Sequence, residues 1–353
     1  MRAYFDSFRI SAVIGVVPSS VSYFDDEVPN YTHDVSSSYK LKEIMGYGEH
    51  RVVTGNTTTC DLASAGIAEL ISRGLLHSDE VNALFFISQT PDYIIPATSS
   101  FLHGQFHLPA DAYCVDINDG CNGYIKGLFE SFSFLNATNA DCAVIVAGDV
   151  LSPLVSRRDR NSFPLVGDAA TVTVIRRNKL WANDKISIAI RNDGSGFDKL
   201  IVPAGGARQK IIGNEVDELD SEGNSRSVRN LRMNGRDVFA FTQTVVPDFL
   251  QEIMEVEGLK PSDVDRFYLH QANAFIIDRL RKKLGASADQ MPDRIVRKYG
   301  NSSSGTIPML IATEPKGDQI LRCMLGGFGV GLSWGAVNLM LQPTVSQGIL
   351  EVK

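Results

Sequence analysis

The chain has 353 residues, of which 44% are hydrophobic and 21% charged, and a formal net charge of −7. This composition is that of a soluble globular protein, and it argues against a nucleic-acid surface, which would be basic. Five scattered cysteines without a CxxC pair indicate neither a disulfide framework nor a zinc site, and no apolar run resembles a signal peptide or a membrane span, so we expect a metal-free, cytoplasmic protein with no membrane contact.

Buried strands alternate with helices through the first half of the chain. Continuous apolar runs such as residues 81–88 and 142–148 are typical of strands covered on both faces, and this order predicts a mostly parallel, helix-covered sheet. The predicted strands are 8–17, 81–88, 113–118, 142–148 and 171–175; the predicted helices are 41–47, 61–73, 97–106 and one that starts at residue 121; residues 18–38 are a predicted loop.

The polar segment 176–184 is the predicted junction between two halves, 1–180 and 181–353. In the second half, strands are expected at 185–191, 267–269, 320–325 and 334–341, and helices at 238–256 and 275–284. Residues 193–234 form a long insertion rich in glycine and charge. In each half a strand follows a glycine-containing turn, and this faint symmetry favours a duplicated α/β unit.

The segment around Cys121 is the first candidate for chemistry. A predicted strand ends at Asn118, an Asp-Gly turn follows, and a helical pattern begins immediately after the cysteine. Unpaired backbone N–H groups and the helix dipole favour a thiolate at such a position, so we predict a nucleophilic Cys121 held as an anion. The alternative is one more inert buried thiol.

Two further polar side chains occupy comparable positions. His270 follows a short buried strand, and Asn301 follows Gly300 at the start of a predicted helix. Strand ends at one edge of a parallel sheet are where such folds collect their sites. A lone histidine can also serve a structural role, and asparagine is a common helix cap.

Four motifs together resemble the β-ketoacyl-acyl-carrier-protein synthase III family of the thiolase superfamily. They are DGCNGY around Cys121, HQAN at His270, YGNSSSGTIP around Asn301, and the closing GGFGVGLSWG. The resemblance extends nearly from end to end. It implies duplicated thiolase-like α/β halves in a layered αβαβα fold with mixed, mostly parallel sheets, with Cys121 in the first half, His270 and Asn301 in the second, and a homodimer.

The resemblance also implies an acyltransferase with a ping-pong reaction. Cys121 takes an acyl group from a thioester, and the backbone N–H groups of Cys121 and Val330 form the oxyanion hole. Malonyl-acyl carrier protein then loses CO2, and His270 and Asn301 donate hydrogen bonds to the enolate oxygen. Phe328 is expected beneath the site. The resemblance implies no bound cofactor. The acyl substrates are expected to be thioesters of acyl-carrier-protein phosphopantetheine or of CoA, and the reaction is expected to belong to fatty-acid or related acyl-chain or secondary-metabolite biosynthesis.

The sequence departs from the family pattern where relatives primed by acetyl-CoA clamp the adenine. Lys40 and Ile44 stand where those relatives carry Trp and Arg, so the clamp is missing. Ile95 stands in a loop that crosses the dimer interface in the family and lines the partner's acyl pocket, usually with Phe. We therefore expect an acyl-carrier-protein donor, or an acyl chain other than acetyl.

Carrier-protein docking shows a second departure. Phe275 and Ala240 replace an Arg and a Lys that are common in the family, whereas Lys282 and Lys283 match its basic pair. These two lysines are the predicted docking residues for an acidic carrier-protein helix, and their alternative is a solvated helix end.

Two other functions remain open at this point. Some relatives pass the acyl group from the cysteine to a hydroxyl or an amine without decarboxylation. Others are partner subunits of condensing heterodimers, although these typically lose the nucleophile, which this chain keeps. The sequence does not decide the acyl chain, the pathway or the role of residues 193–234.

Overall fold

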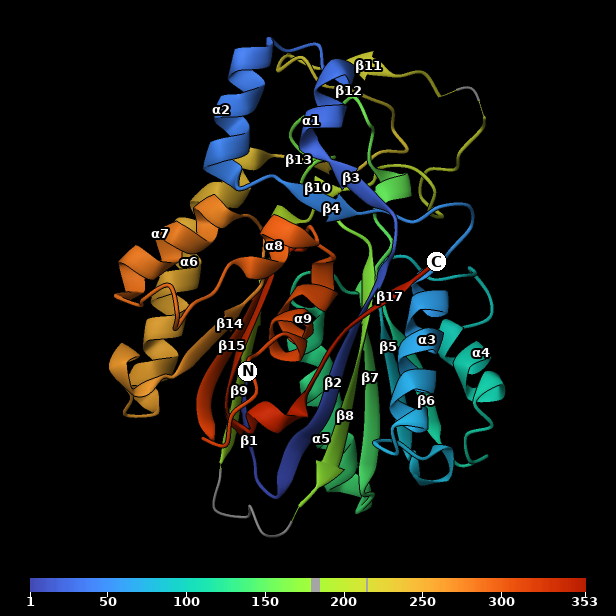
Figure 1. Cartoon of the computed structure of the whole chain (residues 1–353), viewed down its shortest axis with the longest axis vertical. Coiled ribbons are helices and arrows are strands. Elements are labelled where there is room, and N and C mark those ends of the chain that lie inside the picture. The colour runs from blue at the N-terminus through green and yellow to red at the C-terminus, as the bar shows by residue number, and fades with distance from the viewer. Residues whose placement is uncertain (179–184, 214) are drawn as a thin grey trace.

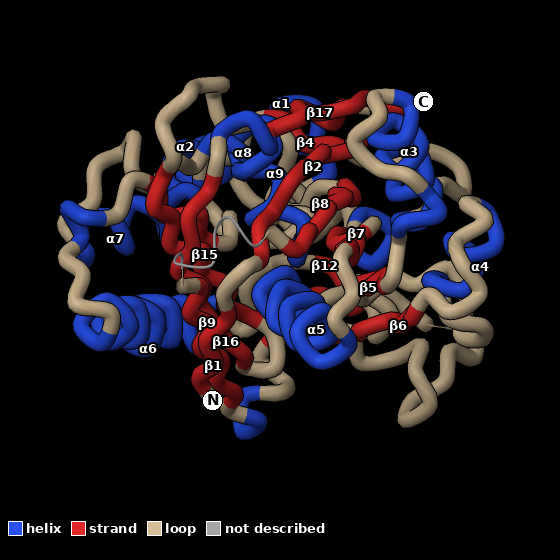
Figure 2. The backbone as a smooth tube through the Cα atoms, turned by 90° about the horizontal axis from the view of Figure 1, so that it is seen from below, coloured by secondary structure: helices blue, strands red, loops and turns tan. Residues whose placement is uncertain are grey.

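The computed structural model describes residues 1–178, 185–213 and 215–353, which form two large sheets with helices on every face (Figures 1 and 2). The first sheet has the order β17-β2-β8-β7-β5-β6. Its strands are β2 (Phe8–Pro18), β5 (Ala83–Ile87), β6 (Tyr113–Ile117), β7 (Cys142–Asp149), β8 (Ala169–Arg177) and β17 (Ser346–Val352). Every residue of β5 and β7 is buried, which explains their uninterrupted apolar sequences.

The second sheet has the order β1-β9-β16-β15-β14. Its strands are β1 (Arg2–Phe5), β9 (Ile186–Asn192), β14 (Arg266–Leu269), β15 (Leu321–Gly329) and β16 (Ser333–Leu341). The first strand of the chain belongs to the second sheet, where β1 pairs with β9. The last strand belongs to the first sheet, where β17 pairs with β2. The two sheets are therefore tied together by both ends of the chain.

The helices are α1 (Phe24–Glu27), α2 (Val35–Met45), α3 (Thr59–Ser72), α4 (Thr98–Gln105), α5 (Gly123–Thr138), α6 (Gly235–Val256), α7 (Ala274–Leu284), α8 (Arg294–Lys298) and α9 (Thr306–Ala312). Six of them form three layers around the sheets. Helices α3 and α4 cover the outer face of the first sheet, α5 and α9 lie between the sheets, and α6 and α7 pack outside the second (Figure 2). The predicted αβαβα layering is confirmed.

Local sequence explains where these helices begin and how closely they pack. Thr58 and Asp61 form a reciprocal capping box at the start of α3. Gly66 lets α3 approach the sheet, since a Cβ there would lie 2.9 Å from both Val16 and Val172. Asn273 caps the start of α7 and accepts a hydrogen bond from the N–H of Ile276.

Three expectations need correction. The predicted mixed sheets are confirmed, but parallel pairing does not predominate: among the described residues four of the nine pairings in the two large sheets are parallel. The predicted loop 18–38 contains β3 (Val21–Tyr23), which pairs with β4 (Glu49–Arg51), as well as α1 and the start of α2. The glycine-rich segment after residue 325 continues β15 as far as Gly329 rather than forming a loop. The predicted boundary at 180/181 lies outside the described residues.

The insertion of residues 193–234 forms two small antiparallel pairs beside α2 (Figure 1). These are β10 (Leu200–Ile201) with β13 (Arg232–Met233), and β11 (Glu218–Leu219) with β12 (Ser225–Arg226). The turn between β11 and β12 is held by hydrogen bonds from Thr32 to the Gly223 carbonyl and from Asn161 to the Glu222 side chain, the latter 2.9 Å long. The insertion is thereby fixed to segments of the first half.

Candidate active site

Cys121 lies in the turn between β6 and α5, two residues before the helix begins, as predicted. Cys121 is buried, with 8% of its surface exposed. Strand β15 packs directly against this turn, because a Cβ on Gly329 would lie 2.6 Å from Cys121 Sγ and one on Gly327 would lie 2.8 Å from Asn122 Cα. Glycines at these positions therefore allow the two backbone segments to meet.

Burial governs the ionisation of this thiol. It raises the pKa of Cys121 to about 11, although hydrogen bonds from the backbone of Val330 and of Cys121 itself act in the opposite direction. The predicted resting thiolate is therefore wrong, because desolvation outweighs the hydrogen bonds from the two backbone amides. The same contacts place the two backbone amides named for the oxyanion hole next to the sulfur.

His270 follows β14 and is 1% exposed. Burial lowers its pKa to about 3, so the imidazole is neutral at physiological pH. Its Nδ1 lies 2.8 Å from Thr306 Oγ1, and its ring meets the Phe328 ring edge to face with 5.7 Å between centroids. The expected packing of Phe328 against the site is confirmed.

Asn301 is held by backbone contacts between two loops. Its N–H donates to the Leu165 carbonyl at 2.8 Å, and its own carbonyl accepts from the N–H of Gly167 at 3.0 Å. Its side-chain Oδ1 accepts from the N–H of Ser303 at 2.9 Å. Because Oδ1 is engaged in this way, the amide Nδ2 is the end left to donate to another group.

One cavity of about 600 Å³ brings these elements together. Cys121, Asn301 and Val330 line it, together with Gln89 and Ser303. Most of the remaining lining is apolar. The first half contributes Leu151, Leu154, Leu165 and Val166, and the insertion contributes Phe197, Leu200, Ile201, Val202, Ala204, Leu231 and Met233. His270 is not among the lining residues and adjoins them through Ser303, whose backbone hydrogen-bonds to its ring.

Several residues around the cavity were not predicted from the sequence. Thr306 contacts His270, and Gln89 and Ser303 line the cavity next to Cys121. Asp149, at the end of β7, is buried and accepts hydrogen bonds from Ser88 Oγ at 2.8 Å and from the N–H of Gln89 at 2.6 Å. Polar residues directly after the buried strand β5 and at the last position of β7 were an available signal, similar to the one that singled out His270.

The other predicted site residues lie away from this cavity. Lys282 and Lys283 are on the surface of α7, where Lys282 pairs with Asp278 at 2.7 Å and Lys283 donates to the Gln243 carbonyl. Ile95 is 84% exposed and does not line the cavity of its own chain. Phe275, which stands where the family commonly has an Arg, stacks on Phe239 with 5.4 Å between the ring centroids.

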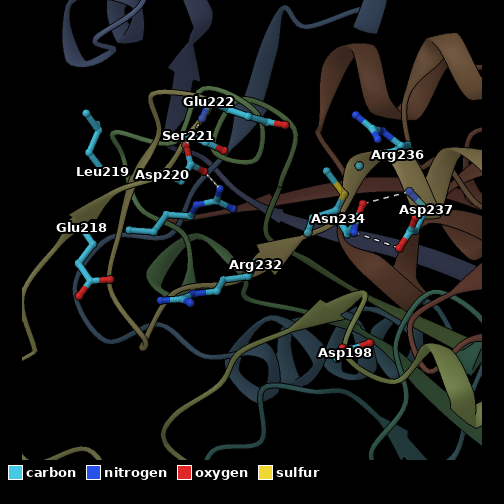
Figure 3. A pocket seen from close by; sticks show the side chains of 13 residues that line it. Asp198, Glu218, Leu219, Asp220, Ser221, Glu222, Arg232, Asn234, Arg236 and Asp237 are labelled. Carbon is cyan, nitrogen blue, oxygen red and sulfur yellow. Dashed lines mark hydrogen bonds and ion pairs between the residues drawn. The ribbon is translucent and has the colours of Figure 1, made fainter.

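A second hollow of about 580 Å³ lies between the insertion and the start of α6 (Figure 3). Carboxylates and guanidinium groups line it, and Asn234 hydrogen-bonds to Asp237 at its rim. It shares Met233 with the cysteine-containing cavity but includes none of the three predicted catalytic side chains. Among the described residues, no three His, Cys, Asp or Glu side chains gather as a metal site, and no helix is long and apolar enough to span a membrane.

Comparisons with known proteins show which family the chain resembles. Family models for 3-oxoacyl-[acyl-carrier-protein (ACP)] synthase III and for its C-terminal part match residues 115–194 and 254–341. A β-ketoacyl-[acyl-carrier-protein] synthase III of Levilactobacillus brevis is 30% identical over 341 residues, covering 95% of this chain and 99% of the relative. A putative 3-oxoacyl-[acyl-carrier-protein] synthase 3 of Campylobacter jejuni is 28% identical, with 99% of this chain and 98% of the relative covered. The crystal structure of a 3-oxoacyl-(acyl-carrier protein) synthase from Burkholderia xenovorans superimposes with a TM-score of 0.91 at 31% identity, covering 100% of this chain and 99% of that one.

Proposed function

Since the chain belongs to the β-ketoacyl-[acyl-carrier-protein] synthase III family, and is accordingly a condensing acyltransferase, we propose that it joins an acyl group carried on Cys121 to a malonyl unit carried on acyl carrier protein. The observation that carries this proposal is the shared cavity. A nucleophilic thiol, two backbone N–H groups and a free carboxamide end converge there, beside a neutral imidazole.

The first half-reaction moves the acyl group to the protein. Cys121 Sγ attacks the thioester carbonyl, and the N–H groups of Cys121 and Val330 stabilise the negative oxygen that forms. The bond to the donor's sulfur then breaks, and the donor thiol leaves with the proton that the Cys121 thiol gives up. No net charge accumulates, which suits a thiol whose pKa is raised by burial.

The second half-reaction forms the carbon–carbon bond. The malonyl thioester loses CO2, and the electron pair of the broken bond becomes an enolate. His270 and Asn301 donate to the enolate oxygen as neutral groups, which spares the site a buried cation. The enolate carbon attacks the acyl carbon, and the bond to Cys121 breaks. The sulfur regains a proton from water, and the β-ketoacyl product leaves on its carrier.

We infer an acyl carrier-protein thioester, or an acyl group larger than acetyl, as the donor. Lys40 and the exposed Ile44 on α2 offer no aromatic and guanidinium pair to hold an adenine. The cavity's aliphatic walls and its volume of about 600 Å³ also leave room for more than two carbons. We place the product in fatty-acid or related acyl-chain biosynthesis. The cytoplasmic location remains a prediction.

Carrier-protein docking at Lys282 and Lys283 and a homodimer are further parts of the proposal. Both lysines are on the exposed end of α7, where an acidic helix can reach them. Support for a dimer comes from β6, which stands at the edge of the first sheet, and from the apolar loop beside it, where Ile94 and Ile95 are 96% and 84% exposed. A partner subunit seated there would cover both.

The test is to supply an acyl donor and malonyl carrier protein labelled in its free carboxylate. We expect an acyl adduct on Cys121 by intact mass, followed by labelled CO2 and a β-ketoacyl product. Asn301→Ala should retain the adduct and lower CO2 release by about 10²–10³-fold, the usual effect of one missing donor. Asn136→Ala, at an exposed position of α5, serves as a surface control. An adduct that forms without CO2 release would instead favour transfer to a hydroxyl or an amine, and no adduct would overturn the proposal.

A further inference from the structure

The side chain of Gln89 lies against Gly120, the residue before Cys121, and leaves no room for a side chain there. It follows β5, and its carboxamide fills the space that a side chain on Gly120 would need: a Cβ there would lie 2.3 Å from Gln89 Oε1 and 2.8 Å from Val330 Cγ1. Gly120 immediately precedes Cys121. The amide is therefore next to the turn that carries the thiol and next to the residue proposed for the oxyanion hole.

Hydrogen bonds hold the backbone of Gln89 and its side-chain oxygen, but not its side-chain nitrogen, among the described residues. The main-chain N–H donates to buried Asp149, and the side chain meets Ser303 Oγ through Oε1 at 3.5 Å. Within the described parts of the chain, the amide nitrogen of Gln89 makes no hydrogen bond. Its surroundings offer few partners, because the rest of the cavity is largely aliphatic. The N–H groups of this half-buried amide are therefore available to donate to a hydroxyl on a ligand that enters the cavity.

The location decides which part of a ligand meets Gln89. An acyl group on Cys121 Sγ places its carbonyl between the N–H groups of Cys121 and Val330, so its next carbons pass the side chain that packs against Gly120 and Val330. Farther carbons meet leucines and valines. Resting on the proposed function, we propose that Gln89 selects acyl groups with a hydroxyl on the first carbons beyond the thioester carbonyl and an apolar remainder.

A competition experiment tests this selection. The full-length protein is mixed with equal amounts of butyryl and 3-hydroxybutyryl groups on acyl carrier protein, and the early ratio of the two Cys121 adducts is read by intact mass. We expect the hydroxylated adduct to exceed the other by about tenfold or more, since a site that hydrogen-bonds a substrate hydroxyl rejects the analogue lacking it. Gln89→Met, of similar length but without the amide, should bring the ratio close to one.

Two variants make the result specific. Gln89→Glu keeps the shape and removes the amide donors, and it should also lose most of the preference. Gln251→Leu makes a comparable change at an exposed position of α6 and should keep the wild-type ratio. Equal labelling by both donors in the wild type, or an unchanged ratio in Gln89→Met, overturns the inference and leaves the proposed function intact. Labelling by neither donor overturns both.

Discussion

At the scale of single residues, two opposing effects meet at the Cys121 sulfur. Two backbone amides favour the thiolate, whereas exclusion from water favours the thiol, and the second effect is the larger one. The nucleophile therefore waits in its protonated form and is shielded from adventitious oxidation and alkylation. Cys121 reacts when a thioester is bound, because the sulfur of the departing donor thiol accepts the proton that the Cys121 thiol gives up.

This balance predicts the pH dependence of alkylation. With a pKa of about 11, the thiolate fraction of Cys121 should rise about tenfold per pH unit from pH 7 to pH 10. The rate of carbamidomethylation, followed on the peptide that contains Cys121, should rise with it. Free cysteine, with a pKa of about 8.5, is the control and should level off earlier. A plateau for Cys121 below pH 9 would show that the amides outweigh burial.

Asp149 gives a second prediction, on stability. Burial raises its pKa to about 7 from 3.8. A carboxyl whose pKa is higher in the folded state binds more protons there than in the unfolded chain, so its contribution is present below pH 4 and is lost as the pH rises through 7. Asp149→Asn should therefore flatten the fall in melting temperature between about pH 4 and pH 7.

The matched control for Asp149 is Asp111→Asn, which changes an exposed carboxylate in the same half of the molecule. It should leave the pH profile of the melting temperature as in the wild type. If Asp149→Asn shows the same fall as the wild type over this range, then Asp149 does not titrate there. Calorimetry at one ionic strength keeps the screening of surface charges the same in every sample.

At the scale of elements, the end of β15 packs directly against the turn that carries Cys121. Gly329→Ala would place a methyl group 2.6 Å from Cys121 Sγ, and because the obstacle is the sulfur itself, the thiol must move. We expect the rate of Cys121 acylation to drop by at least about 10²-fold, the usual cost of misplacing a reacting atom by about 1 Å. Adduct formation measured by mass gives this rate.

Gly317→Ala is the control for that substitution. A Cβ at Gly317 meets nothing within 4 Å, so this change should leave acylation unaffected. A Gly329→Ala protein that acylates at the wild-type rate would contradict the close approach of β15. Measuring the melting temperature of both variants separates a displaced thiol from a general loss of folding.

The elements differ in how far sequence could predict them. Long apolar strands and amphipathic helices were placed to within a few residues, since burial on two faces or on one leaves a clear period. Strand direction was less accessible: β15 and β16 form an antiparallel hairpin because only a tight turn at 330–332 joins them, and a periodic pattern does not report pairing. Polar stretches such as 21–27 contain short helices and strands that the sequence pattern does not indicate, because packing against neighbouring segments stabilises them.

The same limit applies to the site. Motifs identified Cys121, His270 and Asn301 because each stands at the end of an element with an abrupt change of polarity. The protonation state of Cys121 could not be predicted in this way, since it depends on burial by segments distant in the sequence. Gln89 and Thr306 were missed for a related reason: their contacts, with Gly120 and His270, are made only in the folded chain.

At the scale of the whole molecule, the cavity depends on contacts between the halves. Asn301 reaches it through backbone hydrogen bonds to Leu165 and Gly167, and a Cβ on Gly167 would lie only 1.9 Å from the Tyr299 carbonyl oxygen. The exchange of β1 and β17 between the sheets joins the halves further. Sites assembled in this way require the halves to fold against each other before any chemistry is possible.

An assembly of two chains is the prediction at this scale. Near β6, which is the edge strand of its sheet, Tyr93, Ile94, Ile95 and Phe101 are exposed, and a group of exposed apolar side chains of this kind needs a cover in water. We expect the wild type to elute with twice its chain mass of 38.6 kDa in light-scattering chromatography. Ile94→Glu should yield monomers, because a carboxylate at a buried apolar contact lacks a partner.

Ile212→Glu controls for the added charge, since Ile212 is 82% exposed in the insertion, a segment separate from the β6 edge. It should remain dimeric. If Ile95 also lines the acyl cavity of the partner, the Ile94→Glu monomer should lose its discrimination between acyl chain lengths while Ile212→Glu keeps it. A wild type that elutes as a monomer would contradict the dimer, and unchanged chain-length selectivity in a monomeric Ile94→Glu would show that each cavity is complete within one chain.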